Sequence, residues 1–148
     1  MMDNYLGILE ESLQKKLKVL EEIAAYNQEQ EQLLRKESVS LEELDENMSH
    51  KDELIRKVTA LDEGFETLYE RIKEQLLADK DAYKEQIRKL QQLISQVTEK
   101  GVSIQAQESR NKKLIEDYFK RERSQLRQNK QSSACHPRHM ERGYAYQS

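Results

Sequence analysis

The chain has 148 residues, of which 36% are charged and 6% aromatic, with one proline, four glycines and no tryptophan. This composition is typical of long amphipathic helices and argues against a sheet-rich protein or a compact enzyme. The net charge of −3 is too small to indicate a nucleic-acid partner for the whole molecule.

The first predicted helix runs from Asp3 to Glu37. Its apolar residues recur at intervals of three and four up to Ala24, and the pattern weakens after that point. Asp3 or Asn4 is a suitable N-cap. The connection 37–39 is short, so we expect the first and second helices to be antiparallel neighbours.

The second helix should start at Ser40 and end near Leu77. Ser40 and Glu43 form a capping box, in which the hydroxyl accepts the Glu43 amide proton and the Glu43 carboxylate reaches back to the Ser40 amide. Val39 and Leu44 are spaced to form the hydrophobic staple that accompanies such a cap. One apolar stripe then follows the whole helix, so other helices must cover it.

Two positions test the length of this second helix. Gly64 costs about 1 kcal/mol relative to alanine, but the apolar stripe keeps its phase across it, so we interpret Gly64 as a flexible point inside one helix. A break is expected at 78–81, where either aspartate can cap the next helix. No glycine or proline enforces a turn there, so a continuous helix through Asp79 is the alternative.

The third helix should run from Asp81 to Leu126 with the alternating four-and-three spacing of a coiled coil. Gly101, Glu108 and Asn111 fall on its apolar stripe and weaken it. At about 1.5 Å per residue this helix would be close to 70 Å long, against about 50 Å for the first. We therefore expect the part after Gly101 to project past its neighbours.

Together these patterns predict an all-α fold, an elongated three-helix antiparallel bundle or coiled coil over residues 1–127. A disordered basic tail should follow at 128–148, because the helical pattern is lost and Pro137 and several serines interrupt it. From Lys120 onward there are seven basic and two acidic residues, a net charge of +5. The rest of the chain therefore has a net charge of −8. A solubilising role is the favoured interpretation of this tail, ahead of nucleic-acid or membrane contact.

No pattern in the chain indicates catalysis. There is no phosphate-binding glycine loop, no nucleophile motif and no carboxylate pair in an apolar setting, so we expect neither an enzyme nor a cofactor. Cys135, His136 and His139 are the one metal-like cluster, but a zinc site needs four ligands in an ordered frame, so no metal is expected. A lone cysteine, no membrane-length apolar run and an acidic, amphipathic N-terminus together predict a cytoplasmic protein with no stable membrane insertion.

The most informative surface candidate is the apolar and aromatic cluster of the third helix. It is either core, covered by a longer first helix or a second copy, or an exposed patch for a partner. The expected projection after Gly101 favours a partner-facing surface. The predicted partner-binding residues are Ile104, Leu114, Ile115, Tyr118, Phe119 and Leu126.

Several stretches of the chain resemble the flagellar export chaperones of the FlgN type. The middle helix carries the acidic-apolar lead of that family, followed by a lysine, two acidic residues, a leucine and a second apolar residue. The resemblance extends roughly from Leu6 to Arg127 and does not include the tail. The stretches that carry it are 51–55, 61–65, 101–105 and 108–112, with Tyr118 and Phe119 closing the third helix.

The resemblance implies a small helical chaperone that binds the hook-filament junction proteins FlgK and FlgL through their C-terminal regions. It would keep them unassembled and pass them to the flagellar export apparatus. Such a chaperone should be a monomer or weak homodimer with an uncovered apolar face, and it should bind no nucleic acid. The alternatives are a chaperone of the filament cap protein and a structural homo-oligomeric coiled coil, which would be a tight oligomer.

Overall fold

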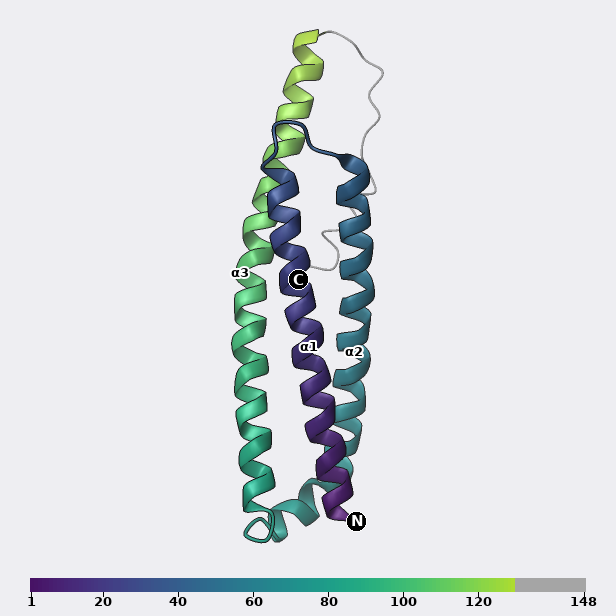
Figure 1. Ribbon diagram of the computed structural model, residues 1–148, viewed down its shortest axis with the longest axis vertical. Helices are drawn as coiled ribbons and strands as arrows, with labels where there is room; N and C mark the ends of the chain where they lie inside the picture. Colours follow the sequence, from purple (N-terminus) through teal and green to yellow (C-terminus); the bar gives the residue numbers. More distant parts are fainter. Residues whose placement is uncertain (130–148) are drawn as a thin grey trace.

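The computed structural model describes residues 1–129, which form three long helices (Figure 1). They are α1 (Met2–Leu34), α2 (Leu41–Ala78) and α3 (Lys84–Asn129), joined in an up-down-up order. The predicted all-α three-helix fold is confirmed, and each helix end lies within three residues of its expected position. Of the predicted tail, the first two residues belong to α3, and 130–148 lie outside the described part of the chain.

The start of α2 is fixed by its side-chain cap. Ser40 has extended backbone angles, and its Oγ accepts a hydrogen bond from the Glu43 amide at 3.2 Å, as predicted. Val39 packs against the apolar cluster that contains Leu44, which is the contact expected of the staple. The Glu43 carboxylate instead faces the Lys36 Nζ at 4.0 Å.

A turn at 79–83 separates α2 from α3, so the alternative of one continuous helix is wrong. Backbone hydrogen bonds from Ala82 to Asp79 (2.9 Å) and from Tyr83 to Lys80 (3.2 Å) close this turn. Gly64 lies inside α2, as predicted, and the space around it is open. The reversal at 79–83 therefore makes α2 and α3 antiparallel and brings α3 back along α1.

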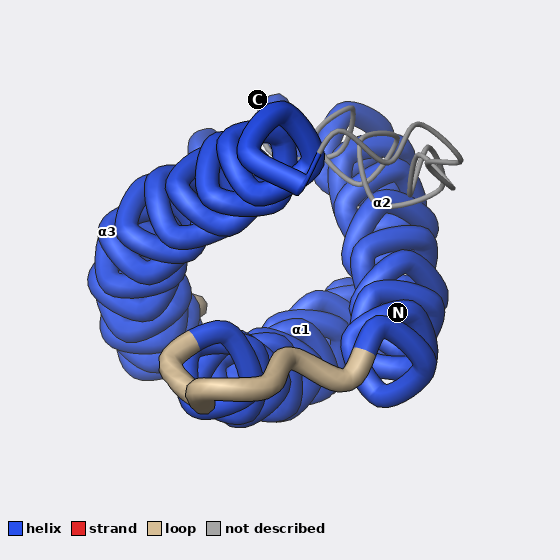
Figure 2. Tube along the Cα trace, turned by 90° about the horizontal axis from the view of Figure 1, so that it is seen from above, coloured by secondary structure: helices blue, strands red, loops and turns tan. Residues whose placement is uncertain are grey.

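Helix α1 lies between α2 and α3. It packs along both α2 and α3, whereas the backbones of α2 and α3 scarcely approach each other (Figure 2). Five hydrogen bonds between α1 and α3 join residues that are 80 to 84 positions apart along the chain. This constant offset means that α1 and α3 run parallel in a single register.

Three apolar clusters fill the bundle from one end to the other. The lower cluster lies at the start of α1, the middle one half-way along it and the upper one at its end. The lower cluster has as its buried members Met2, Leu6, Leu9, Leu13, Ile72, Leu76 and Leu90. The middle cluster contains Leu20, Ile23, Leu54 and Val97. The upper cluster contains Leu33, Leu34, Leu44, Met48, Ile115, Tyr118 and Phe119.

The expectation that α3 is uncovered after Gly101 is wrong. Ile115, Tyr118 and Phe119 are only 0%, 8% and 6% exposed. The reason is the register, because the offset of 80 to 84 brings Leu34, the last residue of α1, level with 114–118. The longer helix projects only beyond this point, above the α1–α2 connection (Figure 1).

Candidate partner-binding groove

A groove of about 590 Å³ opens between α2 and α3, on the side away from α1. Its floor is apolar and comes from α1, through Leu20 and Ile23, which are both largely buried. Its walls combine apolar and polar side chains. They are Ile55, Val58, Thr59 and Asp62 from α2, and Ile104, Gln105, Glu108 and Ser109 from α3.

The groove exists because α1 is the only helix that both others pack against along their length. Ile55, Val58 and Ile104 contact the middle cluster but stay partly exposed, because no fourth helix closes the bundle over them in residues 1–129. In a four-helix bundle the space opposite the shared helix is filled by another helix with an apolar stripe. The groove therefore has the shape and the chemistry to receive one amphipathic helix.

The charges at the groove are neutralised from within the chain. The Asp62 carboxylate lies 2.6 Å from Lys16 Nζ, and the Glu108 carboxylate lies 2.8 Å from Lys51 Nζ. The α3 wall adds little charge, since the stretches 90–98 and 101–107 contain no Asp, Glu, Lys or Arg, although 36% of the whole chain is charged. The groove thus presents an apolar floor between nearly neutral walls.

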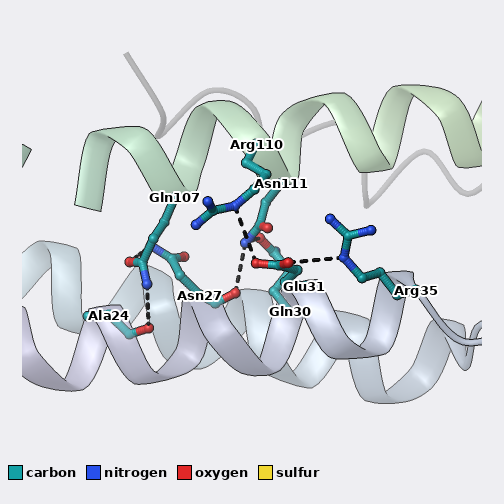
Figure 3. Close-up of polar contacts among 8 residues, drawn as sticks. All are labelled: Ala24, Asn27, Gln30, Glu31, Arg35, Gln107, Arg110 and Asn111. Atoms are coloured by element: carbon teal, nitrogen blue, oxygen red, sulfur yellow. Dashed lines mark hydrogen bonds and ion pairs between the residues drawn. The ribbon is translucent and has the colours of Figure 1, made fainter. Parts of the chain in front are cut away.

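A layer of buried polar side chains separates the middle cluster from the upper cluster (Figure 3). On α3, Asn111 Nδ2 donates to the Asn27 carbonyl at 2.8 Å and to Gln30 Oε1 at 3.1 Å. Gln107 Nε2 donates to the Ala24 carbonyl at 3.2 Å, and its Oε1 accepts from Asn27 Nδ2. These bonds explain the fixed α1–α3 register, because a shift by one turn would leave every amide without its partner.

The same layer extends to α2 and reaches the groove. Asn47 Nδ2 donates to the Tyr26 carbonyl at 2.9 Å and to Glu29 Oε1 at 3.0 Å, which ties α2 to α1. The ion pair of Lys51 with Glu108 ties α2 to α3, and their side chains are only 5% and 12% exposed. We refer to these side chains as the polar layer. Its members are Asn27, Gln30, Asn47, Lys51, Gln107, Glu108 and Asn111.

The polar layer does not satisfy all of its own hydrogen-bonding groups. Five buried side-chain atoms in the described residues have no partner within the protein. They are Asn27 Oδ1, Gln30 Nε2, Asn47 Oδ1, Glu108 Oε2 and Asn111 Oδ1. Buried polar groups are normally paired. The polar layer therefore contributes less to the stability of the fold than the apolar clusters on either side.

The six side chains predicted to bind a partner fall into three separate places. Ile104 lines the groove, and Leu126, 37% exposed, stands on the projecting end of α3. The other four, Leu114, Ile115, Tyr118 and Phe119, meet in the upper cluster against α1 and α2. Burial, reinforced by the nearby Glu122, raises the pKa of the Tyr118 hydroxyl, which fits a core position.

The sequence alone did not single out the α2 wall of the groove. Ile55 and Val58 belong to the apolar stripe of α2, where they look like any other covered residue. Glu108 and Asn111 weaken the stripe of the third helix, and Lys51 stands at a stripe position of the second helix, between Met48 and Ile55. The available signal was that all three polar residues interrupt apolar stripes, which is where a buried polar layer would be found.

No metal or membrane feature emerges from the described part of the chain. Within residues 1–129, no three His, Cys, Asp or Glu side chains are grouped so that they could hold a metal ion. Cys135, His136 and His139 lie outside that range. None of the three helices is long and apolar enough to cross a membrane.

Comparison with known proteins gives one result. A family model described as FlgN protein matches residues 1–134, which include all three helices and the groove. No curated protein and no solved structure matches the chain. The family match covers well over half of the sequence and agrees with the resemblance seen in the second and third helices. The chain belongs to the FlgN family of flagellar export chaperones.

Proposed function

We propose that this chain is a cytoplasmic chaperone for hook-filament junction proteins of the FlgK and FlgL type. It takes an amphipathic helix from the C-terminal region of the substrate into the groove between α2 and α3. The substrate is thereby kept unassembled until it is passed to the flagellar export apparatus. The observation that carries this proposal is the open groove of about 590 Å³, with an apolar floor and no covering helix in the described residues.

The energetics of such a complex suit reversible binding. A guest helix that buries four or five apolar side chains gains roughly 1.5–3 kcal/mol from each. If the guest segment is disordered before binding, ordering it costs about 2–5 kcal/mol or more. The difference supports a complex that is stable enough to protect the substrate and weak enough to release it.

The main contact surface for the substrate is then the groove, and not the upper cluster. Ile104 keeps its predicted role as a partner contact, now together with Ile55 and Val58 across the groove. Leu126 is proposed as a secondary contact, because it is exposed on the part of α3 that extends past α1. Ile115, Tyr118 and Phe119 support binding only indirectly, by holding α3 against α1 and α2.

Isothermal titration tests this assignment. The C-terminal segment of a hook-filament junction protein is titrated into the wild-type chain and into a variant with Ile55→Ala and Ile104→Ala. Loss of two half-buried contacts should weaken binding by about tenfold or more. A matched control combines Ile8→Ala with Val102→Ala, which are 54% and 62% exposed away from the groove lining, and should bind like the wild type.

Two results would contradict the proposal. Unchanged binding by the groove variant, with a thermal melt showing that it is folded, would place the guest elsewhere on the chain. Preference for the filament cap protein over the junction proteins would instead support the alternative chaperone role. Leu126→Ala, tested separately, should weaken binding less than the groove variant does.

A further inference from the structure

We infer that charge fixes the direction in which a guest helix lies in the groove. The guest that fits is a helix with basic residues along one flank of its apolar stripe and uncharged residues along the other. This inference rests on the proposed function and adds the chemistry of the partner and its orientation. It follows from a difference between the two walls, which lie on either side of the same space but do not carry the same charge.

The α2 wall becomes acidic where it leaves the groove toward the lower cluster. The stretch 58–70 contains four acidic residues and no basic one. Asp62 lines the groove, and Glu66 lies one turn further along the same face of α2. Asp62 is paired with Lys16, whereas Glu63 and Glu66 are exposed and have no ion-pair or hydrogen-bond partner in residues 1–129. This wall therefore offers two carboxylates that a guest can reach.

The part of α3 across from these carboxylates is uncharged. Because α2 and α3 are antiparallel and Lys51 meets Glu108, each step along α2 from Lys51 corresponds to an equal step back along α3 from Glu108. Residues 62–66 therefore lie about level with 93–97. The stretch 90–98 contains no Asp, Glu, Lys or Arg, so nothing on α3 balances the acidic wall.

An apolar contact is also available at this level, on the α3 side. Ile94 and Thr98 precede Gln105, a groove residue, by eleven and seven positions, which are about three and two helical turns. All three side chains therefore lie on one face of α3, and Ile94 is 45% exposed. A guest helix that extends past the groove meets carboxylates on one side and only uncharged side chains on the other.

The handedness of the α-helix converts this difference into a direction. Seen from above, α3 lies to the left and α2 to the right, with the groove on the side away from α1 (Figure 2). In a guest with apolar heptad positions a and d, the flanks are positions e and g. A guest that runs parallel to α2 turns its g positions to α2, and a guest that runs parallel to α3 turns its e positions there. A single basic flank therefore favours one direction.

The expected preference is moderate, because the contacts are exposed. Lysines on the flank that faces α2 lie across from Glu63 and Glu66, whereas lysines on the other flank meet uncharged groups. Each exposed ion pair changes a binding constant by about 1.5-fold to fivefold. Two such contacts favour one direction by about twofold to twentyfold. An acidic flank beside α2 would be repelled, which excludes helices of equal apolarity but the wrong charge.

Disulfide cross-linking of two synthetic peptides tests the direction. Both are helices of about 21 residues with Leu at a and d and an N-terminal cysteine. One has Lys at g and Gln at e, and the other has the reverse, so their compositions are identical. The full-length chain carries Cys135→Ser and one new cysteine, either Ser109→Cys at the Glu108 end of the groove or Gln91→Cys toward the lower cluster.

The peptide with Lys at g should cross-link mainly at position 109, and the peptide with Lys at e mainly at position 91. Glu63→Gln with Glu66→Gln should reduce this preference until each peptide reacts at both positions about equally. The matched control is Glu46→Gln with Glu53→Gln, which removes two exposed carboxylates from another face of α2 and should keep the preference.

Equal yields at both positions in the wild-type background, or the opposite preference, overturn this inference. A preference that survives Glu63→Gln with Glu66→Gln also overturns it, because the direction would then have another cause. In these cases the proposed function stands if isothermal titration still shows binding of the C-terminal segment of a hook-filament junction protein. Binding of that segment but of neither peptide overturns the inference alone. Absence of binding by the segment and by both peptides overturns the inference and the proposed function together.

Discussion

At the scale of single residues, the Lys51–Glu108 ion pair combines a stabilising contact with a cost. Both charges are nearly buried, and one carboxylate oxygen is unpaired. Replacing such a pair by apolar residues is often neutral or stabilising by about 1–4 kcal/mol, whereas removing one partner costs about 3–5 kcal/mol. Urea unfolding should therefore show Glu108→Ala strongly destabilised and Lys51→Met with Glu108→Leu close to or above the wild type. Equal losses in both variants would mean that the charges themselves are needed for folding.

Burial of the aromatic pair on α3 leads to a second prediction. Tyr118 and Phe119 pack in the upper cluster, with ring centroids 5.7 Å apart. Truncating a buried Phe to Ala typically costs about 3–5 kcal/mol, so Tyr118→Ala with Phe119→Ala should lower the melting temperature sharply. Val102→Ala, on a 62% exposed side chain, is the control and should melt like the wild type. An unaffected melt in the double variant would return these residues to the surface.

Asp52 gives a pH-dependent prediction with a definite sign. Burial raises the pKa of its carboxyl above the usual 3.8, although Arg56 and Lys51 oppose this. The folded state then retains a proton that the unfolded state releases, so the free energy of unfolding falls as pH rises from 3.8 through the folded pKa. Asp52→Asn removes this loss, and its melting temperature should rise relative to wild type between pH 3 and pH 7. Ser49→Ala, which removes no titrating group, should show a difference from wild type that does not change with pH.

At the scale of elements, the N-terminus of α2 depends on one hydroxyl. Ser40→Ala removes the bond to the Glu43 amide, and loss of such a cap typically costs about 1 kcal/mol. The melting temperature should fall by a few degrees, while binding of the guest segment is retained, because the groove lies further along α2. Ser38→Ala, in the connection before the cap, serves as the comparison. A melt identical to wild type would show that the first turn of α2 contributes little to stability.

Element positions were predictable from the sequence because their causes are local. The apolar spacing places all three helices, and Ser40 with Glu43 and Val39 places the start of α2. The α2–α3 break carried a weaker signal, since only aspartates suggested it. The register was not predictable, because all three stripes have similar spacing and nothing local states which helix lies between the other two. The prediction that Ile115 faces a partner was wrong for this reason, because it assumed that α1 and α2 end well before Ile115.

At the scale of the whole molecule, the groove could not be predicted for the same reason. Its ten lining residues come from three helices, and only their joint arrangement leaves Ile55 and Ile104 facing a common space. Ile104 and Leu126 were predicted to flank the aromatic cluster of the third helix, yet the fold places Ile104 in the groove and Leu126 on the projecting end of α3. A pattern on one helix identifies a buried or exposed face, whereas a groove is a property of the packing between helices.

Association state is the prediction that belongs to the complete chain. With one face of the bundle open, the protein without its guest should be a monomer or a weak homodimer whose mass average rises with concentration. Addition of the guest segment should yield a complex whose mass no longer depends on chain concentration in this way. Sedimentation equilibrium over a hundredfold concentration range measures both. A tight oligomer that excludes the guest would favour the structural coiled-coil alternative.

The parallel pairing of α1 and α3 also has a kinetic consequence. Every hydrogen bond between these helices closes a loop of 80 to 84 residues, whereas α1 and α2 first meet across a short connection. Loop-closure entropy therefore opposes early α1–α3 contact, and the α1–α2 hairpin should form first, with α3 docking last. On the ribosome, docking must wait until most of the chain has been synthesised. Pulse-labelled hydrogen exchange during refolding should accordingly protect the α1–α2 junction before the amides of α3.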